Sequence, residues 1–418
     1  MDILRALLGI AVFVALAWLV SWDRLRFQWR VVVGGVLLQI LIAFVVLETT
    51  IGTKFFDAVA AFITKLVSMT VPGAQAVFGS LADPSTSTGF IFAFAGTGLV
   101  VIIFVSALMS VLYHFGIMQI LVWALAKVMS ATMGLSGGES MAAAANVFMG
   151  QTEAPLVIRP YLAKMTKSEL NALMTGGFAT IAGSVMAVYM QILGPELAPH
   201  LVTASVMSAP ASFVMAKIIL PERETPETAG RTELKIERNA NNVIEAAANG
   251  TSDGLKLWLN VIAMLIAFIA LVALINWPVG ALGDWWGIEG GLSLQRIFGW
   301  VFAPLAWAIG VDGWHDCQLV GGLLGTQVSV NEFVAYQGLG ELMRSTDPAR
   351  MFEDVRSAKM ASYALCGFAN FASIGIQIGG IGALVPERKS DLAKIAFRAM
   401  IGGAFACWMT ATIAGMFL

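Results

Sequence analysis

Two segments of the chain carry the same pattern: Thr175-Gly176-Gly177-Phe178-Ala179-Thr180-Ile181-Ala182-Gly183-Ser184 and Leu365-Cys366-Gly367-Phe368-Ala369-Asn370-Phe371-Ala372-Ser373. Each places Gly-Phe-Ala, a polar residue, an apolar residue, alanine and a small residue inside an otherwise apolar stretch. Glycine and polar residues at these positions predict interruptions of two membrane-spanning helices, which free backbone carbonyls and half-helix ends. Paired interruptions of this kind are typical of a substrate and ion site near the membrane midplane.

An acidic element precedes each of these segments. It reads Gln151-Thr152-Glu153-Ala154-Pro155 in the first half and Asn331-Glu332-Phe333-Val334-Ala335 in the second, and an amphipathic stretch (117–129 and 294–308) precedes each element. The first acidic segment is too polar at its centre to span, and basic residues follow it on the side of entry. We therefore expect two re-entrant helical hairpins, at about 137–162 and 314–343, whose polar tips line a cavity.

The composition indicates that most of the surface does not face water. Of 418 residues, 58% are hydrophobic and 12% are charged, and the mean hydropathy is +0.79. About a quarter of the residues of a soluble protein are charged. Apolar runs of roughly 20 residues, too long for barrel strands, recur along the chain. They include 3–22, 31–47, 90–112, 201–220 and 257–275. The sequence thus predicts an all-α integral membrane protein, and the first run lacks the features of a cleaved signal peptide.

Positive charges orient the predicted spans. Three arginines lie in the short loop 23–30, which the positive-inside rule places in the cytoplasm. Threading the spans from there puts most of the 25 lysines and arginines on that side and the N-terminus in the periplasm. On this map Glu153 enters the membrane from the cytoplasmic side and Glu332 from the outer side, so the two repeats are inverted.

The only long polar stretch, 221–253, is interpreted as a solvated linker with a short helix at 240–248. The expected organisation around this linker is scaffold helices and a first interfacial helix at 1–115, a first repeat at 116–220 with an interrupted helix at about 168–192, a scaffold helix at 254–290, and a second repeat at 291–418 with an interrupted helix at about 353–382.

Several classes of function are disfavoured. Neither the three cysteines nor the three histidines have the spacing of a metal site, and Cys317, Cys366 and Cys407 are expected to be packing residues. A net charge of −2 indicates no nucleic-acid partner.

The two glutamates carry the chemistry. A carboxylate at membrane depth costs several kcal/mol or more unless it has a partner, and it is usually functional; the alternative is a glutamate that is protonated or paired for structure alone. Because no lysine or arginine accompanies the tips, we expect a neutral or weakly charged solute with several hydrogen-bonding groups. The hydroxyls, amides and free carbonyls of the interruptions suit a dehydrated alkali cation, although small-residue helix packing also explains the glycines. Four phenylalanines offer aromatic faces near the site, although a phenylalanine more often packs in the core or against lipid: Phe178, Phe333, Phe368 and Phe371.

At these residues the sequence resembles the concentrative nucleoside transporter family. The most specific matches are Gly150-Gln151-Thr152-Glu153-Ala154-Pro155-Leu156, Asn331-Glu332-Phe333-Val334-Ala335-Tyr336 and Ala364-Leu365-Cys366-Gly367-Phe368-Ala369-Asn370. Residues 89–94 and 385–391 also resemble family segments. The resemblance covers nearly the whole chain. It implies a homotrimer in the bacterial inner membrane, with eight spanning helices, two opposed re-entrant hairpins and three interfacial helices in each protomer.

The resemblance also implies a function that is not enzymatic. A transport domain would slide across a trimeric scaffold and carry a nucleoside, pyrimidine or purine, together with its coupling cation. The nucleobase would be held by Gln151, Thr152 and Glu153, directly or through water. The ribose hydroxyls would be held by Glu332, Asn370 and Ser373, with Phe368 and Val185 packing nearby. The family's sodium site maps onto Asn146, Thr180 and the carbonyls of Met149 and Ile181.

Two departures from the family pattern put coupling and packing details in question. Gln327 stands where the family usually has lysine, which removes a charge near the second hairpin tip. Ala95-Gly96-Thr97-Gly98 stands where a larger residue and Val-Leu-Pro are expected, which loosens a spanning helix.

The leading hypothesis is therefore sodium-driven nucleoside symport, with no other cofactor. Proton coupling is the nearer rival, because Glu153 or Glu332 could titrate if buried. A channel and an intramembrane hydrolase using both glutamates and His315 are remote alternatives, because interrupted helices on opposed hairpins favour alternating access and no nucleophile motif stands beside the histidine.

Overall fold

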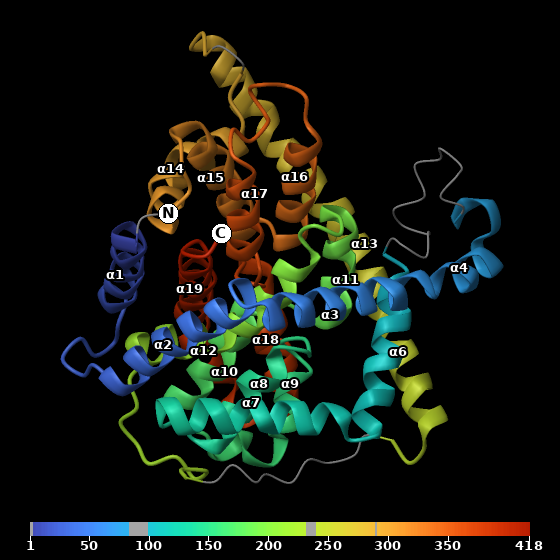
Figure 1. The fold of residues 1–418 in the computed structure, drawn as a ribbon, viewed down its shortest axis with the longest axis vertical. Helices are drawn as coiled ribbons and strands as arrows, with labels where there is room; N and C mark the ends of the chain where they lie inside the picture. The colour runs from blue at the N-terminus through green and yellow to red at the C-terminus, as the bar shows by residue number, and fades with distance from the viewer. Residues whose placement is uncertain (1–2, 83–98, 231–239, 289–290) are drawn as a thin grey trace.

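The computed structural model describes residues 3–82, 99–230, 240–288 and 291–418, which form helices joined by loops with no strand among them (Figure 1). The N-terminal part comprises α1 (Ile3–Leu19), α2 (Trp29–Leu47), α3 (Thr50–Ser68), α4 (Thr70–Phe78), η1 (Gly79–Ala82) and α6 (Val101–His114). The departure at 95–98 and the family segment at 89–94 lie outside the described residues.

Two series of α-helices with the same order follow, and α13 (Val243–Trp285) separates them. The first series is α7 (Ile117–Met133), α8 (Gly137–Asn146), α9 (Ala154–Val157), η2 (Arg159–Lys164), α10 (Lys167–Ala179), α11 (Gly183–Leu193) and α12 (Ala198–Ile219). The second series is α14 (Leu294–Ile309), α15 (Trp314–Ser329), α16 (Glu332–Arg344), α17 (Val355–Ala364), α18 (Phe371–Leu384), η3 (Pro386–Arg388) and α19 (Lys389–Ala414). Each series runs from an amphipathic helix through a hairpin and a broken helix to a long final helix.

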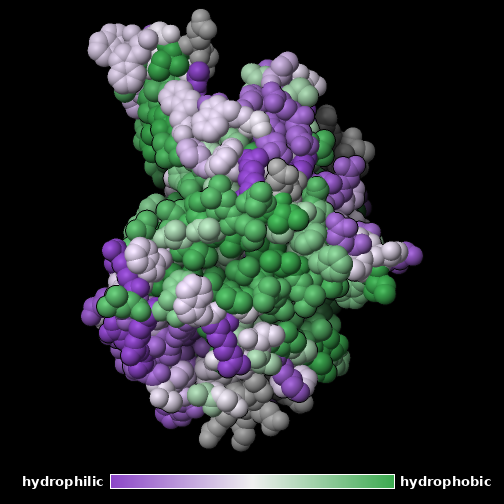
Figure 2. Space-filling model, turned by 60° about the vertical axis from the view of Figure 1, so that its left-hand side comes forward, coloured by the Kyte–Doolittle hydropathy of each residue, from purple (hydrophilic) through white to green (hydrophobic). Residues whose placement is uncertain are grey.

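The apolar surface fits a bilayer. In the described part of the chain, six helices are long and apolar enough to cross a membrane, or up to eight if two bent pairs each count as one span. Those pairs, α6 with α7 and α14 with α15, bend by 77° and 109°. Figure 2 shows apolar residues spread over the middle of one face, with hydrophilic residues gathered towards both ends. The predicted all-α membrane fold with two re-entrant hairpins and an inverted repeat is confirmed.

The helices divide into a buried inner group and an exposed outer group. α10 and α11, which flank the first interruption, are almost wholly buried, and α10 packs against both α12 and α19. By contrast, α13 (Val243–Trp285) exposes most of its length and packs along α6. In Figure 1 α13 runs along one side of the molecule, and α7 lies across the lower part of the molecule. The first interruption therefore lies in a buried core of helices, with α6 and α13 beside it.

The expected boundary between a linker ending at 253 and a scaffold helix beginning at 254 is wrong, as is the separate short helix at 240–248. A single helix, α13, begins at Val243, where the side chain of Asn242 caps it by accepting a hydrogen bond from the Glu245 N–H at 2.9 Å. The glycine-containing stretch at the expected end of the linker is a packing surface. A Cβ atom on Gly250 would lie 2.6 Å from the Ser106 carbonyl oxygen, and one on Gly254 would lie 2.7 Å from the Ile103 Cα. The glycines therefore let α13 approach α6 closely.

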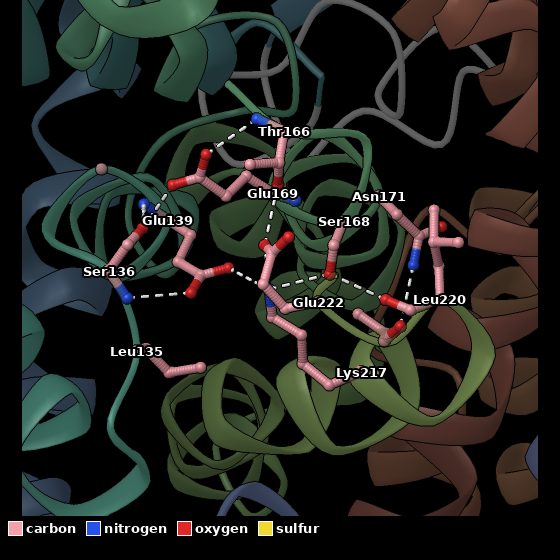
Figure 3. Close-up of polar contacts among 12 residues, drawn as sticks. Leu135, Ser136, Glu139, Thr166, Ser168, Glu169, Asn171, Lys217, Leu220 and Glu222 are labelled. Atoms are coloured by element: carbon pink, nitrogen blue, oxygen red, sulfur yellow. Dashed lines mark hydrogen bonds and ion pairs between the residues drawn. The ribbon is translucent and has the colours of Figure 1, made fainter. Parts of the chain in front are cut away.

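Two capping boxes anchor the first hairpin (Figure 3). Ser136 and Glu139 form one at the start of α8, and Thr166 and Glu169 form the other at the start of α10. In each box, side-chain oxygens accept hydrogen bonds from backbone N–H groups that would otherwise be unpaired. The Ser136 hydroxyl also donates to Glu169 Oε1 at 2.5 Å. This bond joins the hairpin directly to the interrupted helix.

A buried lysine, Lys217, links the two capping boxes, and we call it together with Glu139, Ser168 and Glu222 the Lys217 cluster. Lys217, in the last turn of α12, lies with its Nζ 2.6 Å from Glu139 Oε2 and 3.6 Å from Glu222 Oε2, and it donates to the Ser168 hydroxyl at 3.0 Å. The side chains of Lys217 and Glu139 are only 2% and 3% exposed. Helix N-termini favour the acidic residues and a C-terminus favours the lysine. The Lys217 cluster thus joins α8, α10 and α12 to one another.

Candidate functional site

The tip of the first hairpin is a tight turn between α8 and α9. Glu153 precedes α9, its N–H donates to the Gly150 carbonyl at 3.0 Å, and the Gly150 N–H donates to Glu153 Oε2 at 3.2 Å. Proline at the next position but one suits the first turn of a helix, where its missing N–H costs no hydrogen bond. The Glu153 carboxylate is thereby folded back over its own turn, with Gln151 and Thr152 between the two ends.

The tip of the second hairpin places a carboxylate at a helix N-terminus. Asn331 caps α16 by accepting from the Val334 N–H at 2.8 Å, and Glu332 is the first helical residue. The Tyr189 hydroxyl donates to Glu332 Oε1 at 2.9 Å, and Asn370 Nδ2 donates to Oε2 at 2.8 Å. Glu332 is 7% exposed. Two donors and the positive end of a helix dipole therefore support this buried carboxylate.

The two helix interruptions lie at 180–182, between α10 and α11, and at 365–370, between α17 and α18. Asn370 caps α18 by accepting from the Ser373 N–H at 2.8 Å, so both ends of its amide are fixed when its donation to Glu332 is included. Gln327 donates from one nitrogen to the carbonyls of Leu365 and Gly367, at 3.1 and 3.0 Å. The neutral side chain at this departure from the family pattern therefore ties the second hairpin to carbonyls of the second interruption.

One cavity of about 160 Å³ joins the hairpin tips and the interruptions. All eight residues expected to bind substrate line it: Gln151, Thr152, Glu153, Val185, Glu332, Phe368, Asn370 and Ser373. α13 contributes four apolar residues to its lining: Leu257, Val261, Met264 and Leu265. The cavity thus combines hydrogen-bonding groups with a hydrophobic surface, which suits a flat polar solute.

Glu153 also borders a second cavity, of about 130 Å³, between the first hairpin and the helices α6 and α13. Ala182 lines both cavities, and Tyr113, His114 and Asp253 line only this one. The tip of the first hairpin thus lies between the two cavities.

The residues expected to hold sodium lie where the first hairpin meets the first interruption. The Gly183 N–H donates to the Phe148 carbonyl at 3.1 Å, which joins the two segments. Asn146, Thr180 and Ile181 are buried, and Met149 is partly buried beside the second cavity. Neither polar atom of the Asn146 side chain has a hydrogen-bond partner among the described residues. The Thr180 hydroxyl donates to the Gly176 carbonyl at 2.9 Å, which leaves its oxygen lone pairs available. These groups fit an oxygen-seeking cation.

Of the four aromatic residues expected near the site, two line the cavity and two do not. Phe333 and Phe368 line it, whereas Phe178 is fully buried in the core and Phe371 is 53% exposed and stacks on Phe397. Phe178 and Phe371 therefore follow the packing alternative, because neighbouring positions at a helix interruption point in different directions.

Sequence reasoning missed Tyr189 and Gln377. Tyr189 is fully buried, stacks on Tyr336 with ring centroids 4.3 Å apart, and holds Glu332. Gln377, also fully buried, donates to Gln151 Oε1 at 2.9 Å. Each lies one helical turn beyond a predicted site residue, since Tyr189 follows Val185 and Gln377 follows Ser373 by four positions. Polar residues at i+4 in apolar helices are the signal that points to them.

Three family profiles match successive parts of the chain. They are the Na⁺ dependent nucleoside transporter N-terminus at 8–81, a nucleoside recognition profile at 97–196, and the Na⁺ dependent nucleoside transporter C-terminus at 200–415. The chain is 44% identical to an uncharacterized transporter of Haemophilus influenzae, across 100% of this chain and 98% of that protein.

Animal proteins with assigned names are also similar. The chain is 40% identical to human solute carrier family 28 member 3 and to rat sodium/nucleoside cotransporter 1, in each case over 98% of its own length. It spans 59% and 63% of those longer proteins.

Solved structures of the protein CNTnw share the fold. The inward-facing, substrate-bound structure has a TM-score of 0.91 at 38% identity, covering 100% of this chain and 99% of that one. An outward-facing double variant has a TM-score of 0.90 at 38% identity, covering 100% and 98%. The matching profiles and the full-length relatives agree with the two glutamates of the hairpin tips, the paired interruptions and the cavity that they line: the chain belongs to the Na⁺-dependent nucleoside transporter family, and it is a transporter and not an enzyme.

Proposed function

We propose that this protein imports nucleosides by symport with sodium, through an elevator-type alternating-access mechanism. The observation that carries the proposal is the cavity that is lined by polar residues of both hairpin tips and of the second interruption, together with apolar residues of α13. A nucleoside has a flat base and a hydroxyl-rich sugar, and its affinity depends on satisfying both.

The ribose belongs at the second hairpin. Glu332 already accepts one hydrogen bond at each oxygen, from Tyr189 and Asn370, and a carboxylate has about four lone-pair sites in all. It therefore retains acceptor capacity for two vicinal hydroxyls, with a geometry fixed before substrate arrives. Charge-assisted bonds of this kind contribute more than neutral ones.

The base belongs at the first hairpin, between Gln151, Thr152, Glu153 and the side chains of Val185 and Phe368. The side chain of Gln151 donates to the Ser373 hydroxyl at 3.3 Å, which links the base side to the ribose side. The apolar surface of α13 would cover the face of the ring that the polar residues leave open.

Sodium is the second transported solute in this proposal. Asn146, Thr180 and the carbonyls of Met149 and Ile181 would hold it, and the unpartnered amide of Asn146 supports this placement. The bond between Phe148 and Gly183 couples the ion-binding segments to the hairpin tip that reads the base. Sodium bound there would stabilise the tip and so raise the affinity for nucleoside, because binding energies of linked sites are reciprocal.

The movement would involve the buried group of helices as a unit. The Lys217 cluster and Gln327 bind both hairpins to the interrupted helices, whereas α13 with α6 lies beside them. CNTnw has been solved in inward-facing and outward-facing states, which supports alternating access here. We further propose a homotrimer in a bacterial inner membrane, with the N-terminus in the periplasm, as the arginine-rich loop at 23–30 indicates.

The proposal is tested by uptake of radiolabelled uridine into proteoliposomes under an imposed sodium gradient, an imposed pH gradient, or neither. Accumulation above the external concentration only with inward sodium supports sodium symport. Accumulation driven by the pH gradient alone would establish the proton-coupled alternative. Uptake that ignores both gradients would overturn symport and indicate a channel. Chromatography of the internal label checks that uridine is recovered intact, which a hydrolase would not allow.

A further inference from the structure

Gln377 lies behind the base-binding tip and outside the cavity. It is fully buried in α18, one helical turn after Ser373, and it does not line the space that Gln151 and Ser373 line. Its Nε2 donates two hydrogen bonds, to the Met174 carbonyl at 3.1 Å and to Gln151 Oε1 at 2.9 Å. It thus joins α18, α10 and the first hairpin at one point.

The Met174 carbonyl fixes the orientation of the Gln377 amide. A backbone carbonyl can only accept, so the nitrogen of Gln377, and not its oxygen, must face Met174. The same nitrogen carries a second hydrogen and faces Gln151, which must therefore turn its own oxygen towards Gln377. The shape of a glutamine side chain does not show which end of its amide is oxygen and which is nitrogen. At Gln151 the Met174 carbonyl of α10 decides this, because it fixes the amide of Gln377.

Gln151 consequently has its nitrogen on the cavity side. Its Nε2 donates to the Ser373 hydroxyl at 3.3 Å, and Ser373 lines the cavity. One of the two N–H groups is used in this bond and the other is left for a ligand. In this orientation the base meets a hydrogen-bond donor.

Close packing keeps Gln377 in place. A Cβ atom added at Gly177 would lie 2.8 Å from Gln377 Nε2 and 3.0 Å from Gln151 Cβ, so the glycine provides the room in which the two amides meet. Gly177 belongs to the repeated pattern that marks the first interruption.

We propose that Gln377 is a positioning residue that sets base recognition: by holding the oxygen of Gln151 away from the cavity, it makes Gln151 a donor to a carbonyl oxygen or an unprotonated ring nitrogen of the nucleobase. This inference rests on the proposed nucleoside transport and specifies how the base is read. It predicts that the transporter discriminates against bases that lack the acceptor, and that this discrimination depends on Gln377.

The test compares uridine with three analogues in competition uptake: 4-thiouridine, whose O4 is replaced by the weaker acceptor sulfur while N3–H is kept; 2-thiouridine, whose O2 is replaced in the same way; and 3′-deoxyuridine, which lacks a ribose hydroxyl. In the wild type, at least one base analogue should bind about threefold to tenfold more weakly than uridine, the range expected for one neutral hydrogen bond. In Gln377→Met, which is similar in shape but cannot donate, Gln151 is free to turn over. The ratio between that analogue and uridine should fall towards one, while the ratio for 3′-deoxyuridine stays unchanged.

Gln39→Met is the matched control. Gln39 is another fully buried glutamine, and its Nε2 donates to the Gly35 carbonyl of its own helix at 3.2 Å, away from the cavity. Its replacement should leave every ratio at the wild-type value. A merely structural role for Gln377 would lower uptake of all four nucleosides together without changing their ratios.

A second variant keeps the test open if Gln377→Met does not fold. In Gln377→Glu, the protonated carboxyl group donates its O–H to the Met174 carbonyl and presents an oxygen acceptor to Gln151. Gln151 must then turn its nitrogen towards this acceptor and its oxygen towards the cavity. This variant should no longer discriminate against the base analogue that the wild type binds more weakly than uridine. It should instead discriminate against 3-deazauridine, which lacks the N3–H donor. Wild-type uptake with unchanged ratios in both variants would overturn the role of Gln377 alone. Absence of uridine binding by the wild type would overturn the proposed function and this inference with it.

Discussion

The Lys217 cluster provides the sharpest test of how the first hairpin is held. Lys217→Met removes a cation whose side chain is 2% exposed and leaves Glu139, 3% exposed, without the partner that lies 2.6 Å away. Removing one member of a buried ion pair costs about 3–5 kcal/mol, because the remaining charge stays out of water. Glu139 still accepts from the Ser136 N–H at 2.9 Å and lies in the first turn of α8, so we expect the lower end, about 3 kcal/mol.

The assay is denaturant unfolding of the purified protein in detergent, followed by tryptophan fluorescence, together with uridine affinity under conditions where each variant stays folded. Lys164→Met is the matched control, since the pair of Lys164 with Glu227 is 67% and 43% exposed. Such exposed pairs contribute about 0–1 kcal/mol. The affinity for uridine should fall in Lys217→Met and not in Lys164→Met, because only the first loosens the hairpin that carries Gln151.

A double-mutant cycle separates charge from packing. Adding Glu139→Gln to Lys217→Met removes the uncompensated charge, so the double variant should be more stable than Lys217→Met by about 1–3 kcal/mol. Glu139→Gln alone should cost less than Lys217→Met, because Lys217 keeps Glu222 and Ser168. Equal stability of Lys217→Met and Lys164→Met, or additive effects in the cycle, would refute the reasoning.

Further predictions concern the site and its frame. Glu332→Gln should weaken uridine binding about 10-fold to 100-fold by removing charge-assisted bonds, whereas Tyr189→Phe should weaken it less than tenfold, since it removes one of two donors to the carboxylate; calorimetric titration checks both. Thr180→Val should raise the sodium concentration for half-maximal uptake about tenfold by removing one oxygen ligand, and an unchanged value would exclude Thr180 from the ion site. Gly250→Leu should destabilise the protein by about 1–3 kcal/mol through overpacking against α6, whereas Gly73→Leu, with no atom within 4 Å of an added Cβ, should not, as thermal melting would show.

Prediction from sequence succeeded where the signal is local. The hairpin tips are polar residues in apolar surroundings, and the interruptions are glycines in spanning helices, so both are visible as breaks in hydropathy. Prediction failed where a local signal has two meanings. The polar composition up to 253 predicts a linker, yet the chain is helical from Val243, and α6 lies close enough to Gly250 and Gly254 to need glycine there. Phe178, Phe368 and Phe371 are the same residue type in the two repeated segments. Only the backbone direction at each interruption decides which ring lines the cavity.

The sequence by itself determined that this chain is a membrane protein with an inverted repeat, a glutamate on each of two opposed hairpins and the motifs of a nucleoside transporter. Only the tertiary structure decided how the carboxylates and amides are oriented. Tyr189 holds Glu332 from 143 positions away, and Gln377 holds Gln151 from 226 positions away. The physical reason is that hydropathy and helix breaks are properties of neighbouring residues, whereas a hydrogen bond needs a donor and an acceptor brought within about 3 Å at a set angle. Only the packing of separate helices brings such groups together. It gives the two glutamates different partners, since Glu153 accepts from its own turn and Glu332 accepts from Tyr189 and Asn370.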